Sequence, residues 1–335
     1  MIFRNIEFHN AEELVPYEDG WRIHRVPADV RAQCNEGLQT VSSLYGTGVE
    51  LRFVLLGEYA DIRLRALPLP EGQMAFLYYG AIQGGWQQSS FVITERETVI
   101  HITRPGNMEQ LRQLAADTGM PFSPEVIRLV LPYGNIVFLG VEGNVMPPAP
   151  DMLPKKTLLC YGSSITHGSL ALITPYTYPF RMAQKLKMDV LNKGFAGTCH
   201  CERALAEWFS ARKDWDVMTL EMGINMMGMT ETEFERRIDE FTAVMAADGR
   251  PVFATSIFHY NSDHYGADQA RGQRFREIVC KYAQPRLHFV DGLELLDRAD
   301  YITQDMVHPS LEGIIQITDR WTEIIRRQLP ENFFT

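Results

Sequence analysis

From residue 157 to the end of the chain, short apolar runs alternate with segments that have the periodicity of amphipathic helices. This alternation constrains the fold more than any other feature, because it is typical of α/β proteins built on a parallel sheet. Right-handed crossovers bring the carboxyl ends of such strands to one edge of the sheet, where ligands bind. The predicted strands are 158–161, 190–192, 217–222, 252–258 and 287–290.

Two of the intervening helices have clear sequence signatures. Thr230 and Glu233 form a Thr-x-x-Glu capping box, and Gly249 suits a helix end, so a helix is predicted over 231–247. Its expected buried face carries Phe234, Ile238, Phe241 and Met245. The last helix is predicted over 311–327.

Residues 1–145 have a different pattern. Segment 60–66 alternates apolar and charged residues, which is typical of a strand with one buried face. Similar runs cover 49–56, 74–79, 91–102 and 126–141, and a helix is expected only at 108–116. The pattern predicts an antiparallel, jelly-roll-like β-sandwich.

Four prolines within 143–156 favour an extended connection between the two halves. We therefore predict a β-sandwich domain over 1–145, a proline-rich linker over 146–156 and an α/β domain over 157–335.

Composition limits the partners. The formal net charge of −10 argues against nucleic acid or an anionic membrane surface as the main partner. No apolar run reaches the roughly 18 residues of a membrane span, and the first residues lack the apolar core of a signal peptide. The five cysteines are few and odd in number, which favours a reducing cytoplasm as the compartment. The sequence leaves a homo-oligomer open.

The first strand of the α/β half ends in a turn that holds two serines. Residues 158–168 read Leu-Leu-Cys-Tyr-Gly-Ser-Ser-Ile-Thr-His-Gly, so Ser163 and Ser164 follow the strand at its carboxyl end. A serine nucleophile needs an adjacent base, and the base needs an acceptor that fixes its tautomer. Asp305 and His308, three residues apart near the C-terminus, supply both types of group. The alternative interpretation of this Asp-x-x-His segment is a turn in which Ser310 caps the last helix.

Two further strand ends carry hydrogen-bond donors. Gly197 follows the second predicted strand, and Asn225 follows the third. The tetrahedral oxyanion of acyl transfer is stabilised by preorganised donors such as a glycine N–H and an asparagine amide. Both residues are expected on the same edge of the sheet as Ser164.

The order Ser164, Gly197, Asn225, Asp305 and His308, spread over residues 158–312, resembles the four sequence blocks of the SGNH (GDSL-like) hydrolase superfamily. The resemblance implies a three-layer α/β/α, flavodoxin-like domain that works without a cofactor or metal. It implies Ser164 as nucleophile, His308 as base and Asp305 as its orienting group. The Gly197 N–H, the Asn225 side chain and the Ser164 N–H would form the oxyanion hole.

The chain departs from the family pattern at two positions. Ser163 replaces the Asp of Gly-Asp-Ser, and Met226 replaces the Asp that often follows the third-block Asn. We assign the nucleophile to Ser164 because it aligns with the family serine and is followed by Ile165 and Thr166.

Other candidate residues lie outside this set. His259 and His264 follow the fourth predicted strand, and Trp86 lies in an aromatic loop of the first domain; all three are candidate substrate contacts. Cys199-His200-Cys201 suggests a metal site, but the second ligand pair of a typical zinc site is missing, so no metal is predicted.

These features predict a serine esterase. A β-sandwich ahead of an SGNH domain resembles bacterial carbohydrate esterases, which implies a short acyl group, acetyl above all, on a carbohydrate or small-molecule ester. The alternatives are a lysophospholipase or thioesterase of the same fold, an acyltransferase, and a non-catalytic carbohydrate-binding protein.

Overall fold

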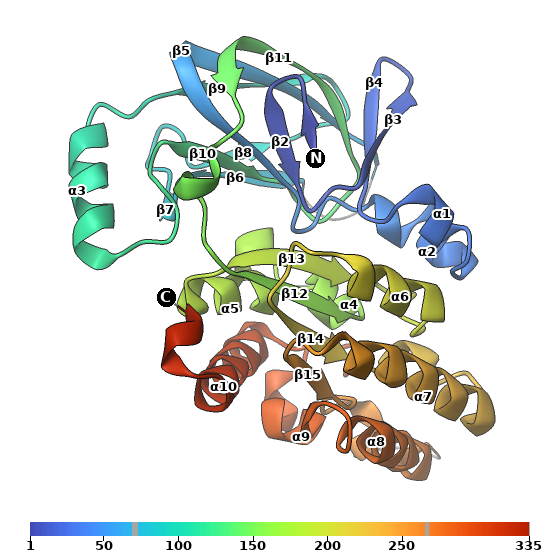
Figure 1. Cartoon of the computed structure of the whole chain (residues 1–335). Coiled ribbons are helices and arrows are strands. Elements are labelled where there is room, and N and C mark those ends of the chain that lie inside the picture. Colours follow the sequence, from blue (N-terminus) through green and yellow to red (C-terminus); the bar gives the residue numbers. More distant parts are fainter. Residues whose placement is uncertain (69–72, 265–267, 335) are drawn as a thin grey trace.

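The computed structural model describes residues 1–68, 73–264 and 268–334 of the chain. In its C-terminal half, five parallel strands form one sheet in the order β13-β12-β14-β15-β16 (Figure 1). This is the 2-1-3-4-5 order of flavodoxin-like folds, as predicted. The strands are β12 (Thr157–Gly162), β13 (Asp189–Gly194), β14 (Val217–Glu221), β15 (Val252–Thr255) and β16 (His288–Val290).

Helices cover both faces of this sheet (Figure 1). On one face, α5 (Tyr178–Leu186) packs against α10 (Leu311–Gln328). On the other face, α6 (Arg203–Ala211), α7 (Glu231–Asp248) and α8 (Gln269–Ala283) lie side by side. The short helices α4 (Ser164–His167) and α9 (Gly292–Leu295) follow β12 and β16. The three-layer prediction is confirmed.

One predicted strand is too long. β15 ends at Thr255, although the apolar run continues to Phe258. Beyond the strand, Arg276 of α8 donates to the carbonyl oxygens of Ile257 and Phe258, at 2.8 Å each. The Arg276 guanidinium therefore satisfies the carbonyl groups of residues 257 and 258, for which the sequence pattern predicts pairing within a sheet.

The N-terminal half is an antiparallel sheet of 11 strands that is continuous through β5 (Glu50–Ala66). The first residues of β5 pair with β2 and β10, and its later residues pair with β9 and β11. The other strands are β1 (Ile2–Phe3), β2 (Ile6–His9), β3 (Glu13–Tyr17), β4 (Gly20–His24), β6 (Met74–Tyr79), β7 (Ile82–Gln83), β8 (Ser90–Val92), β9 (Thr98–Thr103), β10 (Val126–Val130) and β11 (Ile136–Met146). The β-rich first domain is confirmed, and its jelly-roll topology stays a prediction.

The α-helices in the described part of this half are α1 (Ala28–Arg31), α2 (Glu36–Thr40) and α3 (Met108–Thr118). Only α3 was expected from the sequence. Val30 of α1 and Leu38 of α2 are buried in the same apolar cluster as α6, α7 and α8. Phe76 of β6 and Val130 of β10 belong to the cluster that contains α5 and α10. The first half therefore fills part of both cores of the second.

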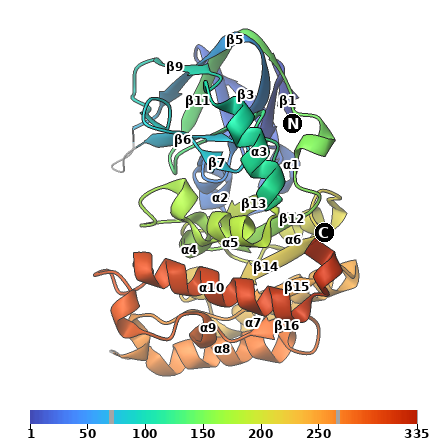
Figure 2. The ribbon, with the colours of Figure 1, turned by 90° about the vertical axis from the view of Figure 1, so that its left-hand side faces the viewer.

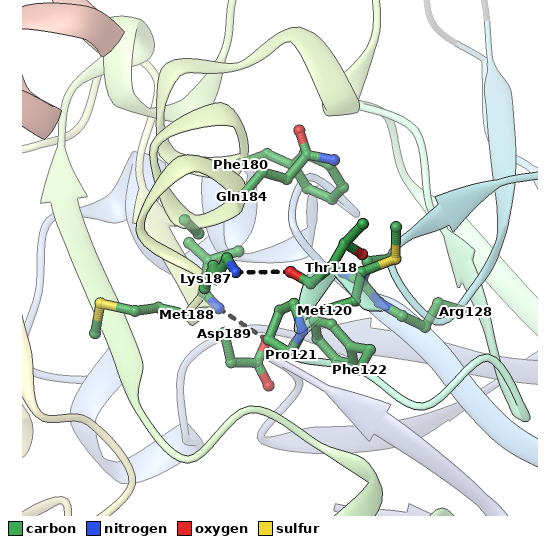
Figure 3. Close-up of a pocket in the computed structure, with 13 residues that line it drawn as sticks. Thr118, Met120, Pro121, Phe122, Arg128, Phe180, Gln184, Lys187, Met188 and Asp189 are labelled. Carbon is green, nitrogen blue, oxygen red and sulfur yellow. Dashed lines mark hydrogen bonds between the residues drawn. The ribbon is translucent and has the colours of Figure 1, made fainter. Parts of the chain in front are cut away.

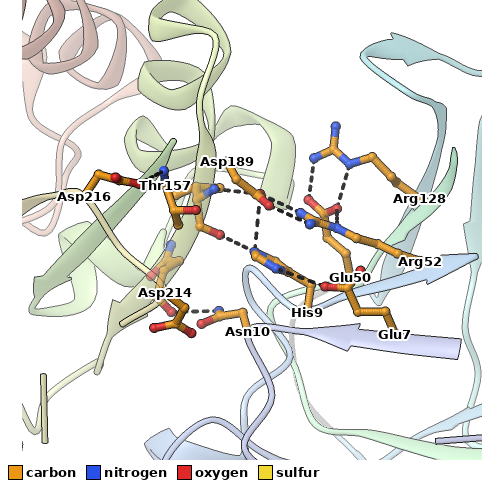
Figure 4. Close-up of polar contacts among 12 residues, drawn as sticks. Glu7, His9, Asn10, Glu50, Arg52, Arg128, Thr157, Asp189, Asp214 and Asp216 are labelled. Atoms are coloured by element: carbon orange, nitrogen blue, oxygen red, sulfur yellow. Dashed lines mark hydrogen bonds and ion pairs between the residues drawn. The ribbon is translucent and has the colours of Figure 1, made fainter. Parts of the chain in front are cut away.

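A chain of buried ion pairs also crosses the junction (Figure 4). Arg52 of β5 contacts both carboxylate oxygens of Asp189 of β13, at 2.6 Å each. Glu50 accepts from both Arg52 and Arg128. Burial would raise the pKa of Asp189, but Arg52 holds it well below its usual range. His9 completes the chain, with its Nε2 2.6 Å from the carbonyl oxygen of Val190.

A cavity of about 290 Å³ lies at the same junction, between α5 and the segment that follows α3 (Figure 3). Lys187 closes one side of it by donating to the carbonyl oxygens of Thr118 and Gly119, at 3.0 Å each. Figure 2 shows α3 and α5 stacked along this boundary. Among the helices that the structure describes, none is long and apolar enough to cross a bilayer.

Candidate active site

Ser164 lies at the carboxyl end of β12, an inner strand of the parallel sheet. The strand ends at Gly162, Ser163 caps α4, and Ser164 is the first residue of that helix. The Ser163 hydroxyl accepts from the Ile165 N–H at 3.1 Å, which fixes the turn. Ser164 is only 9% exposed but lines an open cleft.

Asp305 and His308 approach Ser164 from the loop before α10. His308 Nε2 lies 2.8 Å from Ser164 Oγ, and His308 Nδ1 lies 2.6 Å from Asp305 Oδ2. These distances suit an imidazole that donates from Nδ1 and accepts from the serine hydroxyl at Nε2. The alternative interpretation of this segment also holds, because Ser310 caps α10 through the Gly313 N–H at 3.3 Å.

The loop itself holds Asp305 in place. Asp305 Oδ1 accepts from the N–H groups of Val307 and His308, at 2.9 Å each, and from the Thr303 hydroxyl at 2.8 Å. Partial burial would raise the pKa of Asp305, but the hydrogen bonds from His308, Val307 and Thr303 hold it well below its usual range. The Asp305 carboxylate is therefore ionised at every pH at which the His308 imidazole needs a hydrogen-bond acceptor.

Gly197 and Asn225 line the same cleft as Ser164 and His308. Asn225 Oδ1 accepts from the Cys199 N–H at 3.2 Å, so its Nδ2 is the end of the amide that is left to donate. Gly223 turns the chain from β14 toward Asn225 with a φ of +126°, and a Cβ there would lie 2.5 Å from Ile257. Only glycine fits both the backbone angle and the close approach.

The cleft has a volume of about 570 Å³. Its walls come from the segments that follow β12, β13, β14 and β15 and from the loop before α10. They are lined by Ser164, Ser169, Ala196, Gly197, Ile224, Asn225, Met227, Tyr260, Asn261, Ser262, Asp268, Val307 and His308. The N-terminal domain supports one wall, because the Tyr133 hydroxyl lies 2.9 Å from Ser169 Oγ. Tyr133 also stacks on His167, with ring centroids 4.4 Å apart.

The three other candidate substrate contacts, His259, His264 and Trp86, are not among the described residues that line the cleft. His259 and His264 face each other, with Nε2 atoms 2.7 Å apart, and neither is among the described residues that line the cleft. Asn261, which lies between them in sequence, does line it. Trp86 is fully exposed on its loop. Substrate contact by these three side chains stays a prediction.

Cys199 and Cys201 are buried beside the cleft. Burial raises the pKa of the Cys199 thiol. Within 1–68, 73–264 and 268–334, no group of three His, Cys, Asp or Glu side chains is arranged to hold a metal ion.

Sequence reasoning missed Glu221, the last residue of β14. It is 2% exposed and contacts the turn that carries Ser164. The available signal was a carboxylate within the otherwise uncharged strand Val-Met-Thr-Leu-Glu, since buried carboxylates are rare without partners.

Comparisons with known proteins identify the α/β half. Residues 160–313 match the model of the GDSL-like Lipase/Acylhydrolase family. No curated protein matches the chain.

Among solved structures, the chain is similar to the salicylyl-acyltransferase SsfX3 from a tetracycline biosynthetic pathway, with 15% identity, 97% of each chain covered and a TM-score of 0.75. A putative GDSL-like lipase from Bacteroides ovatus has 16% identity, 91% coverage of each chain and a TM-score of 0.62. A family two carbohydrate esterase from Clostridium thermocellum, solved with cellohexaose, has 14% identity, covers 84% of this chain and 91% of its own, and has a TM-score of 0.53. At these identities the structures show a shared fold.

The parallel sheet and the family match define the class of the C-terminal half: residues 160–313 form a GDSL-like lipase/acylhydrolase domain, as in the SGNH hydrolase superfamily. Within that superfamily it is a carboxylic ester hydrolase.

Proposed function

We propose that Ser164, His308 and Asp305 form the catalytic triad of this ester hydrolase. The observation that carries the proposal is the continuous contact from Ser164 Oγ to His308 Nε2, at 2.8 Å, and from His308 Nδ1 to Asp305, at 2.6 Å. Such a chain activates a serine that is otherwise a weak nucleophile.

In the proposed reaction, Ser164 Oγ attacks the ester carbonyl as its proton moves to His308 Nε2. The carbonyl oxygen becomes an oxyanion, which the N–H groups of Ser164 and Gly197 and the Asn225 amide stabilise. The intermediate collapses to an acyl-enzyme, and the leaving alcohol takes the proton from His308. Water, deprotonated by His308, then releases the acid and restores Ser164.

The proposed oxyanion role of Asn225 predicts the effect of its removal. Asn225→Ala should lower kcat about 10²–10³-fold, because one donor to the oxyanion is lost, and should change KM much less. Initial rates over a range of ester concentrations measure both constants. Asn144→Ala, at an exposed residue of β11 that does not line the cleft, is the control. An increase in KM with kcat unchanged would contradict the assignment.

For the substrate we propose a short acyl group, acetyl above all, on a carbohydrate. The cleft has an open rim with polar side chains at Asn261, Ser262 and Asp268, which suits a hydroxyl-rich alcohol. The shared fold with a carbohydrate esterase solved with cellohexaose supports the same choice. The cysteine content keeps the cytoplasm as the proposed compartment.

Hydrolysis of acetylated sugars and of p-nitrophenyl esters of two to twelve carbons tests both parts of the proposal, with Ser164→Ala as control. We expect the highest kcat/KM at two carbons and no activity in the variant. A maximum at eight carbons or more would exclude the acetyl assignment. Full activity of Ser164→Ala would exclude the triad, and a fluorophosphonate probe should label the wild type at Ser164 alone.

Acyl transfer is the second candidate. It is favoured by the similarity to an acyltransferase across 97% of both chains. The same acyl-enzyme would pass its acyl group to an alcohol instead of water. Adding sugar or alcohol acceptors during turnover and measuring the ratio of new ester to free acid separates the two reactions.

A further inference from the structure

Gly197, the proposed oxyanion donor, lies in a tight turn directly after β13. The Thr198 N–H donates to the carbonyl oxygen of Phe195 at 3.1 Å, which closes a turn with Gly197 at its third position. Gly197 has a φ of +71°, the left-handed angle that the third position of a type II turn requires. A Cβ on Gly197 would meet nothing within 4 Å, so the turn needs glycine for its backbone angle alone. The direction of the Gly197 N–H therefore depends on how the two ends of this turn are held.

The N-terminal half of the chain holds the end of β13 that leads into the turn. Arg25, which follows β4, is fully buried and donates to the carbonyl oxygens of Asn192, at 2.9 Å, and Gly194, at 3.0 Å. Its guanidinium also lies over the ring of Phe195, 5.0 Å from the ring centroid. A further bond, from Nη2 to the carbonyl oxygen of Ser42 at 2.8 Å, fixes the guanidinium to its own half. One planar, preorganised group therefore holds the exit of β13 and the first residue of the turn.

The N-terminal half also holds the residue after Gly197. Ser42 Oγ lies 2.5 Å from Thr198 Oγ1, and Asn35 Nδ2 donates to the Thr198 carbonyl oxygen at 2.9 Å. Asn35 is itself fixed, because its Oδ1 caps α2 by accepting from the Leu38 N–H at 3.0 Å. The turn is therefore attached to the N-terminal half at both of its ends.

A further contact ties the turn to the helix that carries Ser164. The Ala196 N–H donates at 3.2 Å to Nδ1 of His167, the last residue of α4. Burial, together with the nearby charge of Arg25, holds the pKa of His167 well below its usual range, so its imidazole is neutral and able to accept. Ala196 and Gly197 both line the cleft. The N-terminal half and α4 thus hold the turn where it faces the cleft.

We propose that the N-terminal half positions the oxyanion hole, with Arg25 as the principal positioning residue: by holding the end of β13 it fixes the direction of the Gly197 N–H. The inference rests on the proposed oxyanion role of Gly197. A donor contributes to catalysis only if it lies within hydrogen-bond distance of the place where the oxyanion forms. The N-terminal half then affects the chemical step through Arg25 without any contact between Arg25 and the substrate.

Arg25→Met in the full chain tests this role. Without the guanidinium the end of β13 is released, so we expect kcat to fall about 10²-fold with KM nearly constant. The matched control is Arg52→Met/Asp189→Leu, because Arg52 is also a fully buried arginine of the N-terminal half but contacts β13 at its opposite end. Its kcat should stay close to that of the wild type. Both variants are assayed below their unfolding temperatures.

A boronic acid gives a second readout, which loss of stability alone would not change. Phenylboronic acid forms a tetrahedral adduct with a serine nucleophile, and one oxygen of the adduct occupies the oxyanion hole. Arg25→Met should raise its inhibition constant by about as much as it lowers kcat, and the control should leave it unchanged. Equal losses of kcat in Arg25→Met and its control would overturn the inference, and so would a rise in KM with kcat unchanged.

If Arg25→Met does not fold, the contact between Ser42 and Thr198 provides the test. Ser42→Ala and Thr198→Val each remove one hydroxyl of this pair, so each should lower kcat. The double variant should be no worse than the weaker single variant, because both substitutions break the same contact. A lower unfolding temperature with kcat unchanged in all three variants would overturn the inference.

Ser164→Ala and Asn225→Ala distinguish the levels of failure. If Ser164→Ala stays active, the proposed triad fails and the inference fails with it. If both of these variants lose activity while Arg25→Met keeps the kcat of the wild type, only the positioning role of Arg25 fails.

Discussion

At the scale of single residues, hydrogen bonds from neighbouring groups fix the orientation of the side chains in the candidate site. Asp305 Oδ2 lies 2.6 Å from His308 Nδ1, while its Oδ1 accepts from the backbone of its own loop. The Cys199 N–H turns the amide of Asn225 so that its donor end is free for the cleft. Sequence order was enough to propose the five principal residues, because Ser164, Gly197 and Asn225 follow recognisable strands. Asp305 and His308 stand three residues apart just before the last helix. Sequence order gave no indication of the Cys199 contact, which depends on how two loops meet.

Asp305→Asn tests the orienting role at this scale. The amide can keep the bonds to Val307 and His308 N–H, so the loop should persist, but it can donate to Nδ1 and favour the wrong tautomer. We expect kcat to fall by up to about 10⁴-fold with little change in the unfolding midpoint. Steady-state kinetics and thermal unfolding measure the two effects. A loss of less than about tenfold in kcat would show that His308 needs no carboxylate.

At the scale of elements, the predictions were confirmed where the spacing of apolar residues was regular over the whole element. The helix predicted over 231–247 is α7, Glu231–Asp248, with its Thr230 cap and the expected apolar face buried. In contrast, the runs 49–56 and 60–66 form one strand, β5, because β11 pairs with both runs, through Leu55 and Ala60, across a register shift that accommodates the residues between them. The two-residue and four-residue elements near the N-terminus are too short to carry a period, so they could not be predicted.

The turn after β14 provides a test at this scale. Gly223→Ala should strain the backbone and press on Ile257, which displaces Asn225. We expect a lower unfolding temperature and a kcat reduced at least about tenfold. Gly228→Ala is the control, because a Cβ there meets nothing within 4 Å. Equal behaviour of the two variants in kinetics and in thermal unfolding would contradict the argument.

At the scale of the whole molecule, the two halves share apolar cores, and the domain boundaries stay a prediction. Side chains from α1, α2, β6 and β10 complete both cores of the α/β half. Composition and periodicity assign each half its class of fold. They do not report which apolar side chains pack across the junction, because that depends on the relative placement of the two sheets.

The isolated segment 157–335 should therefore fail to fold cooperatively. Without the N-terminal residues, the faces around α5 and α6 expose apolar surface that the intact chain buries. We expect dye binding typical of exposed apolar surface and a broad unfolding curve, with recovery on co-expression of residues 1–156. A sharp, reversible unfolding transition of the isolated segment would show that the junction is dispensable.

The buried ion pairs provide a second test of the junction. Asp189→Asn leaves Arg52 charged and without its bidentate partner, which should lower the free energy of unfolding by about 3–5 kcal/mol. Asp214→Asn, at an exposed carboxylate on the same half, is the control. Arg52→Met/Asp189→Leu should cost less than Asp189→Asn alone. Urea unfolding measures all three, and equal losses for Asp189→Asn and its control would contradict the expectation.

The same carboxylate predicts a pH dependence. Because the folded pKa of Asp189 is depressed, its stabilising effect is complete above the unfolded value of about 4 and is lost as pH falls further. The difference between wild type and Asp189→Asn should therefore be constant from about pH 5 to 7 and shrink in more acidic buffer. Repeating the urea curves at several pH values would measure this trend.

The contact between Ser163 and Glu221 joins two positions that are 58 residues apart in the chain. In this chain the carboxylate beside the turn comes from the neighbouring strand, and position 163 carries a hydroxyl that donates to it. A search pattern that requires an acid immediately before the serine would therefore overlook this chain.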